Sequence, residues 1–433
     1  MSKIKIKNFG PIKEGYLEGD GWLDVKKVTV FIGNQGSGKS TVTKLITTFM
    51  WIEKALTRGD YDKKWFTRKN KLRNQFLSYF RLENYFLESD DQSKAFIDYK
   101  GESFNIRFEN GLLYIEDANN GDYPLPQIMY VPAERNFTSD VKSPKLLKLT
   151  SESMIEFVTE LSKALDDMKG LIRLPINDVD VEYNKQFDTV YIRGKVKDDP
   201  YRIKLSEASS GFQSVVPLYL VSMFLANSVR RQSESTKEAM TSEQRERFRK
   251  RFQEINDNAD LTDEQKRIAI SALGKEFNKT AFINIVEEPE QNLFPISQQK
   301  ILNSLIEFNN MNKGNKLIMT THSPYIINYL TLAVKAHKVK SEITDENQLN
   351  KIAEIIPLQS TLAPDNLVIY EMNENEGSIK KLEDYKGLPS DENYLNDRLA
   401  ETNELFTKLQ EIEKRWIISL KLNNPSVLCP LEF

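Results

Sequence analysis

Several features that define other classes of protein are scarce in this sequence. Its 433 residues include a single cysteine, Cys429, which allows no intramolecular disulfide and is typical of a reducing compartment. No apolar run approaches the roughly 20 residues needed to cross a bilayer, and the N-terminus has no apolar targeting core. The formal net charge of −3 argues against a surface broadly committed to nucleic-acid phosphates. We therefore expect a cytoplasmic protein with no membrane partner.

A glycine-rich loop, GNQGSGKS, occupies residues 33–40 and follows an apolar stretch that reads as a strand. Its spacing is G-x-x-x-x-G-K-[ST], in which glycines let the backbone direct N–H groups at phosphate oxygens. The helix that we expect to begin near Lys39 adds the positive end of its dipole. We predict that Lys39 reaches the β- and γ-phosphates of ATP and that Ser40 binds Mg²⁺. The predicted ATP-binding residues are Gly33, Asn34, Gln35, Gly36, Ser37, Gly38, Lys39, Ser40 and Thr41. The alternative is a turn that matches by accident.

A second apolar stretch, residues 281–286, reads as a buried strand and ends at two acids. Carboxylates at the end of a strand face the crevice in which open α/β sheets bind ligands. Adjacent residues on a strand point to opposite sides, so the two acids should have different roles. We predict that Glu287 faces the water shell of Mg²⁺ and that Glu288 faces the attacking water. The alternative is an acidic loop that caps a buried strand.

Two further segments carry weaker signals. The segment KLIMTTHS, residues 316–323, reads as a strand that ends at His322, one of only two histidines. A histidine at a strand end is more often structural, but this one follows the acidic strand closely and could contact the γ-phosphate. The segment LSEASSGFQS, residues 205–214, places small hydroxyl residues and a glycine before an apolar helix. Exposed N–H groups at such a helix start can bind an anion, although any N-cap has this pattern.

The order of these four segments resembles the ATP-binding-cassette type AAA ATPase heads of the SMC, RecF and OLD-nuclease group. The segment IKIKNFGPIKEG, residues 4–15, also resembles the first hairpin of that group. The resemblance implies an α/β, ABC-ATPase-like P-loop head with a mixed sheet, flanking antiparallel strands and helical or coiled-coil insertions. It also implies a homodimer or higher homo-oligomer in which ATP lies between two protomers. Ser209 or Ser210, with Gly211 and Gln213, would then contact the γ-phosphate bound to another copy, and hydrolysis by Glu288 and His322 would require assembly.

The sequence departs from that pattern in three places. The usual LSGGQ-like signature is ASSGFQ here, which leaves open which serine contacts phosphate and displaces Gln213 by one position. The usual aspartate before the catalytic glutamate is Glu287, as in the EEPE variant of the OLD-like branch. The segment YVPAERN, residues 130–136, also resembles that branch, which implies that Arg135 contacts nucleotide or a neighbouring subunit. An exposed arginine at a strand end is the alternative.

The motifs run from residue 33 to residue 323, so they should converge in one ATPase head spanning residues 1–433. We expect a helical insertion over residues 44–90, a helical hairpin over residues 230–278 and a strand-and-helix extension over residues 365–433. Alternating stretches at 96–117 and 179–205 predict antiparallel strands. Residues 51–86 interleave basic and aromatic side chains, which favours packing of the aromatics over binding of nucleic acid.

Only 110 residues follow Ser323, and their acids form no convincing TOPRIM nuclease pattern. The chain resembles the ATPase subunits of PARIS anti-phage systems, with Septu ATPases a close second. That resemblance implies an ATP-dependent scaffold that holds a separate toxic TOPRIM-type nuclease and responds to a phage protein. A RecF- or SMC-like repair ATPase that binds duplex DNA, and the nucleotide-binding subunit of a transporter, stay open as alternatives.

Overall fold

The computed structural model describes residues 2–58, 60–86, 94–118, 123–139, 141, 151–197, 199–234, 242–258, 261, 265, 266, 269, 273 and 279–423. Its centre is a seven-stranded sheet in the order β2-β16-β15-β4-β14-β13-β8. The five consecutive strands from β15 to β8 are parallel, whereas β16 runs antiparallel to β15. The seven strands are β2 (Gly15–Tyr16), β16 (Ser378–Lys381), β15 (Leu367–Asn373), β4 (Val28–Gly33), β14 (Lys316–Thr321), β13 (Ala281–Glu287) and β8 (Pro126–Val131).

Two antiparallel sheets flank this central sheet. The first has the order β3-β1-β5-β6-β7 and the second the order β12-β11-β10-β9. The first comprises β3 (Leu23–Asp24), β1 (Lys3–Lys7), β5 (Phe96–Lys100), β6 (Phe104–Glu109) and β7 (Leu112–Asp117). The second comprises β12 (Asp199–Lys204), β11 (Thr189–Val196), β10 (Asp180–Asn184) and β9 (Ile172–Arg173), and the short strands β17 (Asp384–Tyr385) and β18 (Leu388–Pro389) pair with each other.

The central sheet separates two apolar cores because successive strand residues point to opposite faces. In β4, Val30 and Ile32 belong to one core while Phe31 belongs to the other. The core on the Phe31 side is covered by α1 (Lys39–Thr57) and the first antiparallel sheet. The helices that contribute to the opposite core are α3 (Glu152–Asp167), α4 (Ser210–Glu234), α7 (Pro295–Asn310), α8 (Pro324–Glu342) and α9 (Glu346–Ile355).

Helix α1 is fastened to the first antiparallel sheet by a buried carboxylate. Glu53 Oε1 accepts the backbone N–H groups of Glu102 and Ser103 at 2.6 and 2.7 Å, and its Oε2 accepts the Tyr99 hydroxyl at 2.7 Å. Gly101 leaves room for this carboxylate, since a Cβ there would lie 2.2 Å from Oε1. The contact fixes the helix that follows the glycine-rich loop.

The basic and aromatic segment that follows α1 uses its rings for packing. It contains α2 (Lys63–Phe66), the π-helical turn η2 (Leu72–Leu77) and the 3₁₀ turn η3 (Ser78–Phe80). The Tyr61 and Trp65 rings stack with centroids 3.9 Å apart, and Phe66 and Phe76 are buried. Lys71 Nζ lies 3.6 Å from the Trp65 ring centroid, so part of the basic charge is engaged as well. These contacts favour the packing interpretation of this segment.

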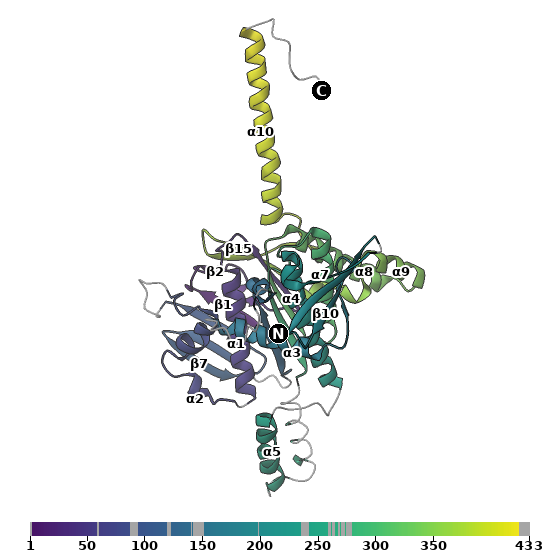
Figure 1. The fold of residues 1–433 in the computed structure, drawn as a ribbon. Coiled ribbons are helices and arrows are strands. Elements are labelled where there is room, and N and C mark those ends of the chain that lie inside the picture. Colours follow the sequence, from purple (N-terminus) through teal and green to yellow (C-terminus); the bar gives the residue numbers. More distant parts are fainter. Residues whose placement is uncertain are drawn as a thin grey trace.

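Two helices stand apart from the body at opposite ends in Figure 1. Helix α5 (Ser242–Asp257) lies where the sequence predicts the first arm of a hairpin; most residues of the predicted second arm lie outside the described residues. Helix α10 (Tyr394–Asn423) projects from the other end. The remaining short 3₁₀ turns are η1 (Gly19–Gly21), η4 (Ala133–Ser139), η6 (Leu205–Glu207), η7 (Leu358–Ser360) and η8 (Pro364–Asn366).

One helix of the described residues, Ser210–Ser233 within α4, is long and apolar enough to span a membrane by length and composition. This differs from the sequence expectation that no apolar run approaches that length. The helix packs in the core, where 61% of its 18-residue apolar window is buried, which accounts for its apolar character. The predicted fold class is confirmed: the chain has the α/β fold of P-loop ATPases, with a mixed sheet, flanking antiparallel sheets and helices.

Candidate nucleotide-binding site

The parallel register brings the ends of three strands to one edge of the central sheet. Thr321 of β14 pairs with Ile32 of β4, and Thr320 pairs with Glu287 of β13. The glycine-rich loop, the turn at His322 and the acidic pair therefore leave the sheet side by side. This is the edge at which open α/β sheets bind ligands.

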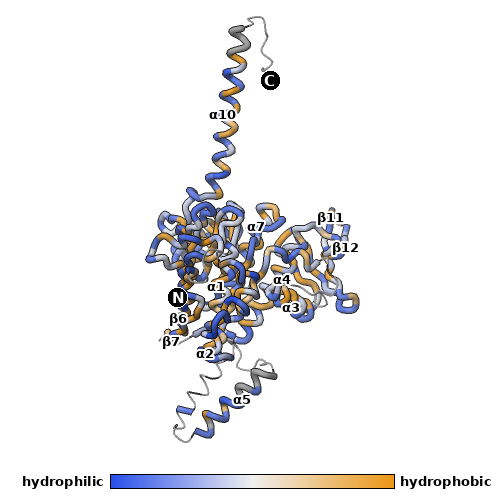
Figure 2. Tube along the Cα trace, turned by 90° about the vertical axis from the view of Figure 1, so that its left-hand side faces the viewer, coloured by the Kyte–Doolittle hydropathy of each residue, from blue (hydrophilic) through white to orange (hydrophobic). Residues whose placement is uncertain are grey.

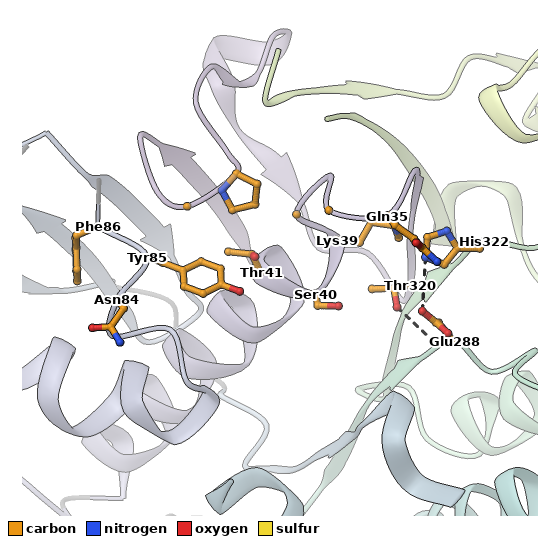
Figure 3. A pocket seen from close by; sticks show the side chains of 14 residues that line it. Gln35, Lys39, Ser40, Thr41, Asn84, Tyr85, Phe86, Glu288, Thr320 and His322 are labelled. Atoms are coloured by element: carbon orange, nitrogen blue, oxygen red, sulfur yellow. Dashed lines mark hydrogen bonds and ion pairs between the residues drawn. The ribbon is translucent and has the colours of Figure 1, made fainter. Parts of the chain in front are cut away.

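A cavity of about 800 Å³ opens at this edge. In Figure 3, Lys39, Ser40, Thr320, Glu288 and His322 gather at one end, while Tyr85 lies toward the other. The complete lining is Gly10, Pro11, Gln35, Gly36, Gly38, Lys39, Ser40, Thr41, Asn84, Tyr85, Phe86, Glu288, Thr320 and His322. The volume is in the range of sites that enclose a small organic ligand, roughly 300–1,000 Å³.

The loop requires glycine at two positions. Gly33 has φ 145°, and a Cβ on it would lie 2.4 Å from the carbonyl oxygen of Met372 on the neighbouring strand β15. Gly38 has φ 98° and is the N-cap of α1. A left-handed residue at this point turns the chain from the loop directly into the helix. The loop therefore presents the N-terminus of α1 to the cavity, where an anion is stabilised.

Lys39 is the buried cation of the site. Its Nζ donates to the carbonyl oxygens of Gly33 at 2.9 Å and Asn34 at 2.7 Å. Burial lowers the pKa of Lys39 to about 8, although the nearby carboxylates of Glu288 and Glu290 oppose the shift. A buried ammonium that has only carbonyl partners is ready to exchange them for phosphate oxygens, which carry full charge.

Of the nine residues predicted to bind ATP, the structure places six in the cavity lining: Gln35, Gly36, Gly38, Lys39, Ser40 and Thr41. The other three hold the loop in shape. Besides Gly33, these are Asn34, whose side chain donates to Glu374 Oε1 at 2.8 Å, and Ser37, whose hydroxyl donates to the Asn34 carbonyl at 2.8 Å. Their contribution to binding would be through the backbone.

The side chains of Glu288 and His322 lie next to each other at the end of the cavity that is formed by the glycine-rich loop. Glu288 Oε1 lies 3.5 Å from His322 Nε2, and each side chain keeps about a third of its surface exposed, at 35% and 31%. Burial and the adjacent negative charge of Glu287 raise the pKa of Glu288. Burial and the charge of Lys39 lower the pKa of His322, so its ring is neutral at neutral pH. A carboxylate with a raised pKa beside a neutral imidazole suits transfer of a proton from water.

Glu288 has a backbone conformation that its neighbours enforce. Its φ is 44°, which is uncommon for a residue with a side chain. Its N–H donates to the Thr320 carbonyl at 3.0 Å, and its own carbonyl accepts from Arg135 at 2.7 Å. The backbone changes direction at this turn, just after the strand. As a result Glu288 lines the cavity, while Glu287 lies beneath the edge of the sheet.

Glu290, for which the sequence predicts no role, stabilises the turn that carries His322 by hydrogen bonds. Its Oε1 accepts the His322 backbone N–H at 2.7 Å and the Thr321 hydroxyl at 2.8 Å. Burial raises the pKa of this carboxyl. Glu290 is the last acid of the EEPE sequence, and its position just after a buried strand is the signal that could have indicated this role. A buried acid at a strand end needs hydrogen-bond donors, which the backbone can supply.

Glu287 does not line the cavity but lies behind it, 5% exposed. Its Oε2 accepts the Ala133 N–H at 3.3 Å, whereas Oε1 is buried without a hydrogen-bond partner. An unpaired buried carboxylate oxygen fits a cation or a water bound to one. Mg²⁺ usually keeps several waters and takes one or two protein ligands beside substrate phosphates, so Ser40 and Glu287 fit this ion when ATP is bound.

The interpretation of Arg135 as a nucleotide or subunit contact is wrong. Its side chain is wholly buried and donates only to backbone carbonyls. Nε contacts Ser214 at 3.0 Å, one terminal nitrogen contacts Glu287 at 2.7 Å and Pro132 at 3.2 Å, and the other contacts Glu288. An exposed arginine, the alternative, is excluded as well. Burial lowers the pKa of Arg135 to about 10, so it remains charged at neutral pH.

The serines of the ASSGFQ segment lie outside this cavity. Ser209 and Ser210 are exposed at the N-terminus of α4. Gly211 packs so closely on the turn after β13 that a Cβ there would lie 2.8 Å from the Asn292 carbonyl oxygen. Gln213 donates to the carbonyls of Ala208 at 3.1 Å and Ser206 at 3.2 Å, which fixes the loop before the helix. None of these four residues contributes to the cavity lining.

The far end of the cavity is formed by residues that the motifs do not reveal. Gly10 and Pro11 come from the first hairpin, and Asn84, Tyr85 and Phe86 from the segment after η3. The Gly10 N–H donates to the Tyr85 carbonyl at 2.8 Å, and the Tyr85 ring stacks on Phe9 with centroids 6.0 Å apart. A fixed aromatic ring with 37% of its surface exposed can stack on a nucleobase.

One protein-family model matches part of this chain. Residues 136–327 match the protein family described as an AAA ATPase domain, a match that contains the ASSGFQ segment, the acidic pair and His322. No curated protein matches the chain.

Similar solved structures include the SMC head domain from Thermotoga maritima, with 12% identity, a TM-score of 0.33 and coverage of 88% of this chain and 98% of that one. The Smc head with an extended coiled coil, bound to the C-terminal domain of ScpA from Pyrococcus furiosus, has 11% identity, a TM-score of 0.33 and coverage of 95% and 100%. A dimeric ATP-binding cassette, MJ0796, bound to ADP and Pi, has 12% identity, a TM-score of 0.28 and coverage of 88% and 100%. At these scores the similarities assign no ligand or partner to this chain.

The pKa of Lys39 predicts a pH dependence of nucleotide binding. Phosphate oxygens favour protonated Lys39, so binding above pH 8 must take up a proton. ATP affinity should be constant up to about pH 7 and fall as pH rises through 8, by up to about tenfold per pH unit. Titration of a fluorescent ATP analogue between pH 7.0 and 9.5 measures this. Lys39→Arg keeps its charge and should show no such fall; an equal fall in both proteins would contradict the role of Lys39.

Tyr85 should contribute part of the ATP affinity by stacking on the nucleobase. Tyr85→Ala removes a stacking surface and should weaken ATP binding by roughly tenfold, equivalent to about 1.4 kcal/mol, while Tyr85→Phe should bind normally. Tyr385→Ala removes an exposed ring outside the cavity and is the matched control. Isothermal titration with ATP and with inorganic triphosphate separates the effects, since Tyr85→Ala should leave triphosphate binding unchanged. Equal losses for both ligands would contradict stacking on the base.

Proposed function

We propose that the chain binds ATP and hydrolyses it in a site completed by a second copy. The observation that carries this proposal is the separation of the predicted site residues into two exposed groups. The loop, Glu288 and His322 line one cavity, whereas Ser209 and Ser210 lie outside it on a free helix N-terminus. Such an N-terminus has unpaired N–H groups suited to phosphate. A head-to-tail pair of copies would place it over the γ-phosphate of the partner's ATP.

In this arrangement each group has a defined task. Lys39 exchanges its carbonyl partners for β- and γ-phosphate oxygens, and the N-terminus of α1 stabilises their charge. Glu288 orients the attacking water and accepts its proton, and neutral His322 donates a hydrogen bond to the γ-phosphate. Bound Mg²⁺, held through Ser40 and Glu287, would neutralise charge on the phosphates. Turnover should be slow in a lone copy because one phosphate-binding helix start is missing.

We further propose that this ATPase acts as a cytoplasmic switch in an anti-phage system. It would hold a separate TOPRIM-type nuclease and release it when a phage protein is sensed. Support comes from the sequence resemblance to PARIS and Septu ATPases. The identity of the adjacent gene tests the assignment: a TOPRIM-like neighbour supports it, whereas salt-dependent binding of duplex DNA by the lone protein favours the RecF- or SMC-like alternative.

The proposal predicts a trapped assembly when the catalytic carboxylate is neutralised. Glu288→Gln should lower ATP turnover at least about 100-fold, because the amide cannot accept a proton. ATP affinity should change less than about twofold, and the ATP-bound protein should accumulate as an oligomer larger than the nucleotide-free protein. Steady-state phosphate release and light scattering after chromatography in ATP measure the two effects. Glu354→Gln, an exposed change on α9, is the control. Unchanged turnover in Glu288→Gln would rule out its catalytic role.

A further inference from the structure

Helix α10 stands away from the body for most of its length (Figure 1). Its start is anchored, since the Tyr394 N–H donates to Glu371 Oε1 on β15 at 2.8 Å. Strand β15 lies next to β4, where Met372 pairs with Gly33 of the glycine-rich loop. The helix therefore begins at the edge of the sheet that carries the nucleotide cavity, and its free part is not covered by the described residues of the body.

The free part of α10 carries a continuous apolar stripe. Leu405, Leu409, Ile412 and Trp416 follow each other at intervals of four, three and four residues, which places them on one face of a helix. Each keeps between 53% and 64% of its surface exposed, and Phe406 beside them keeps 61%. In Figure 2 apolar and polar segments alternate along this helix. Contiguous large apolar side chains at this exposure mark an interaction surface rather than a solvated face.

The stripe is complementary to itself when reversed. Its intervals read the same from either end, so an antiparallel pair centred between residues 410 and 411 sets Leu405 against Trp416 and Leu409 against Ile412 of the other helix. The charges of the helix fit the same register. Lys408 of each helix lies opposite Glu413 of the other, so two pairs of opposite charges meet, whereas parallel pairing in register sets each charged residue against its own copy.

We propose that α10 pairs with α10 of a second copy as an antiparallel two-stranded coiled coil. In that pair the two anchored ends lie about 50 Å apart, given a rise of 1.5 Å per residue. The nucleotide edges of these two copies are thus held apart, and the pairing needs no nucleotide. It is an interface distinct from the proposed ATP sandwich. A chain with both interfaces links more than two copies, so ATP adds to an oligomer that already exists.

Sedimentation velocity of the full chain without nucleotide tests this pairing. The unaltered protein and Lys39→Ala should both be dimers, since neither depends on ATP. The double variant Leu409→Glu/Ile412→Glu should be a monomer, with the dimer dissociation constant raised roughly 100-fold or more. Phe187→Glu, the same chemical change at a 66% exposed position on the β10–β11 turn, should remain a dimer. Circular dichroism checks that the variants are folded. A monomeric unaltered protein, or a stripe variant that stays dimeric, would overturn the proposal.

Disulfide trapping tests the direction of the pair in a Cys429→Ser background, which removes the single native cysteine. One chain carries Leu405→Cys and a second chain of different tag length carries Trp416→Cys. Antiparallel pairing should give mostly the mixed disulfide on oxidation, whereas disulfides only between identical chains would overturn the antiparallel arrangement. Failure of the ATP-driven assembly would leave both results unchanged, so the two proposals fail separately.

Discussion

The arrangement of the candidate site depends on one buried guanidinium. A buried charge is costly unless its donors are satisfied, and Arg135 meets this requirement with the carbonyls of Pro132, Ser214, Glu287 and Glu288. These carbonyls belong to the end of β8, the start of α4 and the end of β13. The side chain therefore fixes the ASSGFQ helix relative to the turn that carries Glu288, and it supports the left-handed backbone of that residue.

Much of the fold could be predicted from the sequence because its signals are local. The strand before the glycine-rich loop and the acidic strand are short apolar runs bounded by Gly33 and Pro289, and the structure has both strands. The role of Arg135 could not be predicted, because it depends on three elements that meet only after folding. Tyr85 lies in an irregular segment without periodicity and reaches the cavity only because it packs on the first hairpin. For α10, periodicity predicts a helix but cannot tell whether its stripe is covered.

The shifted pKa values of three side chains in the cavity suit the binding of a negatively charged nucleotide. Lys39 is held among carbonyls with a lowered pKa, and Glu288 has a raised pKa beside neutral His322. Burial thus disfavours the charged form of all three groups, and bound phosphate oxygens would favour the charged form of Lys39. Ser209 and Ser210 lie outside this cavity and are exposed on the surface of the chain. In the proposed composite site, bound nucleotide would report the presence of a second copy.

Complementation between two inactive variants tests this composite site most directly. Lys39→Ala removes the phosphate lysine, and Ser209→Asp/Ser210→Asp places negative charge on the helix that should approach the partner's γ-phosphate. Each variant alone should be inactive, whereas an equal mixture should recover about a quarter of normal turnover, because half of the pairs are mixed and each mixed pair has one intact site. Ser206→Asp is the control for added charge. A mixture as inactive as its components would contradict a site shared between copies.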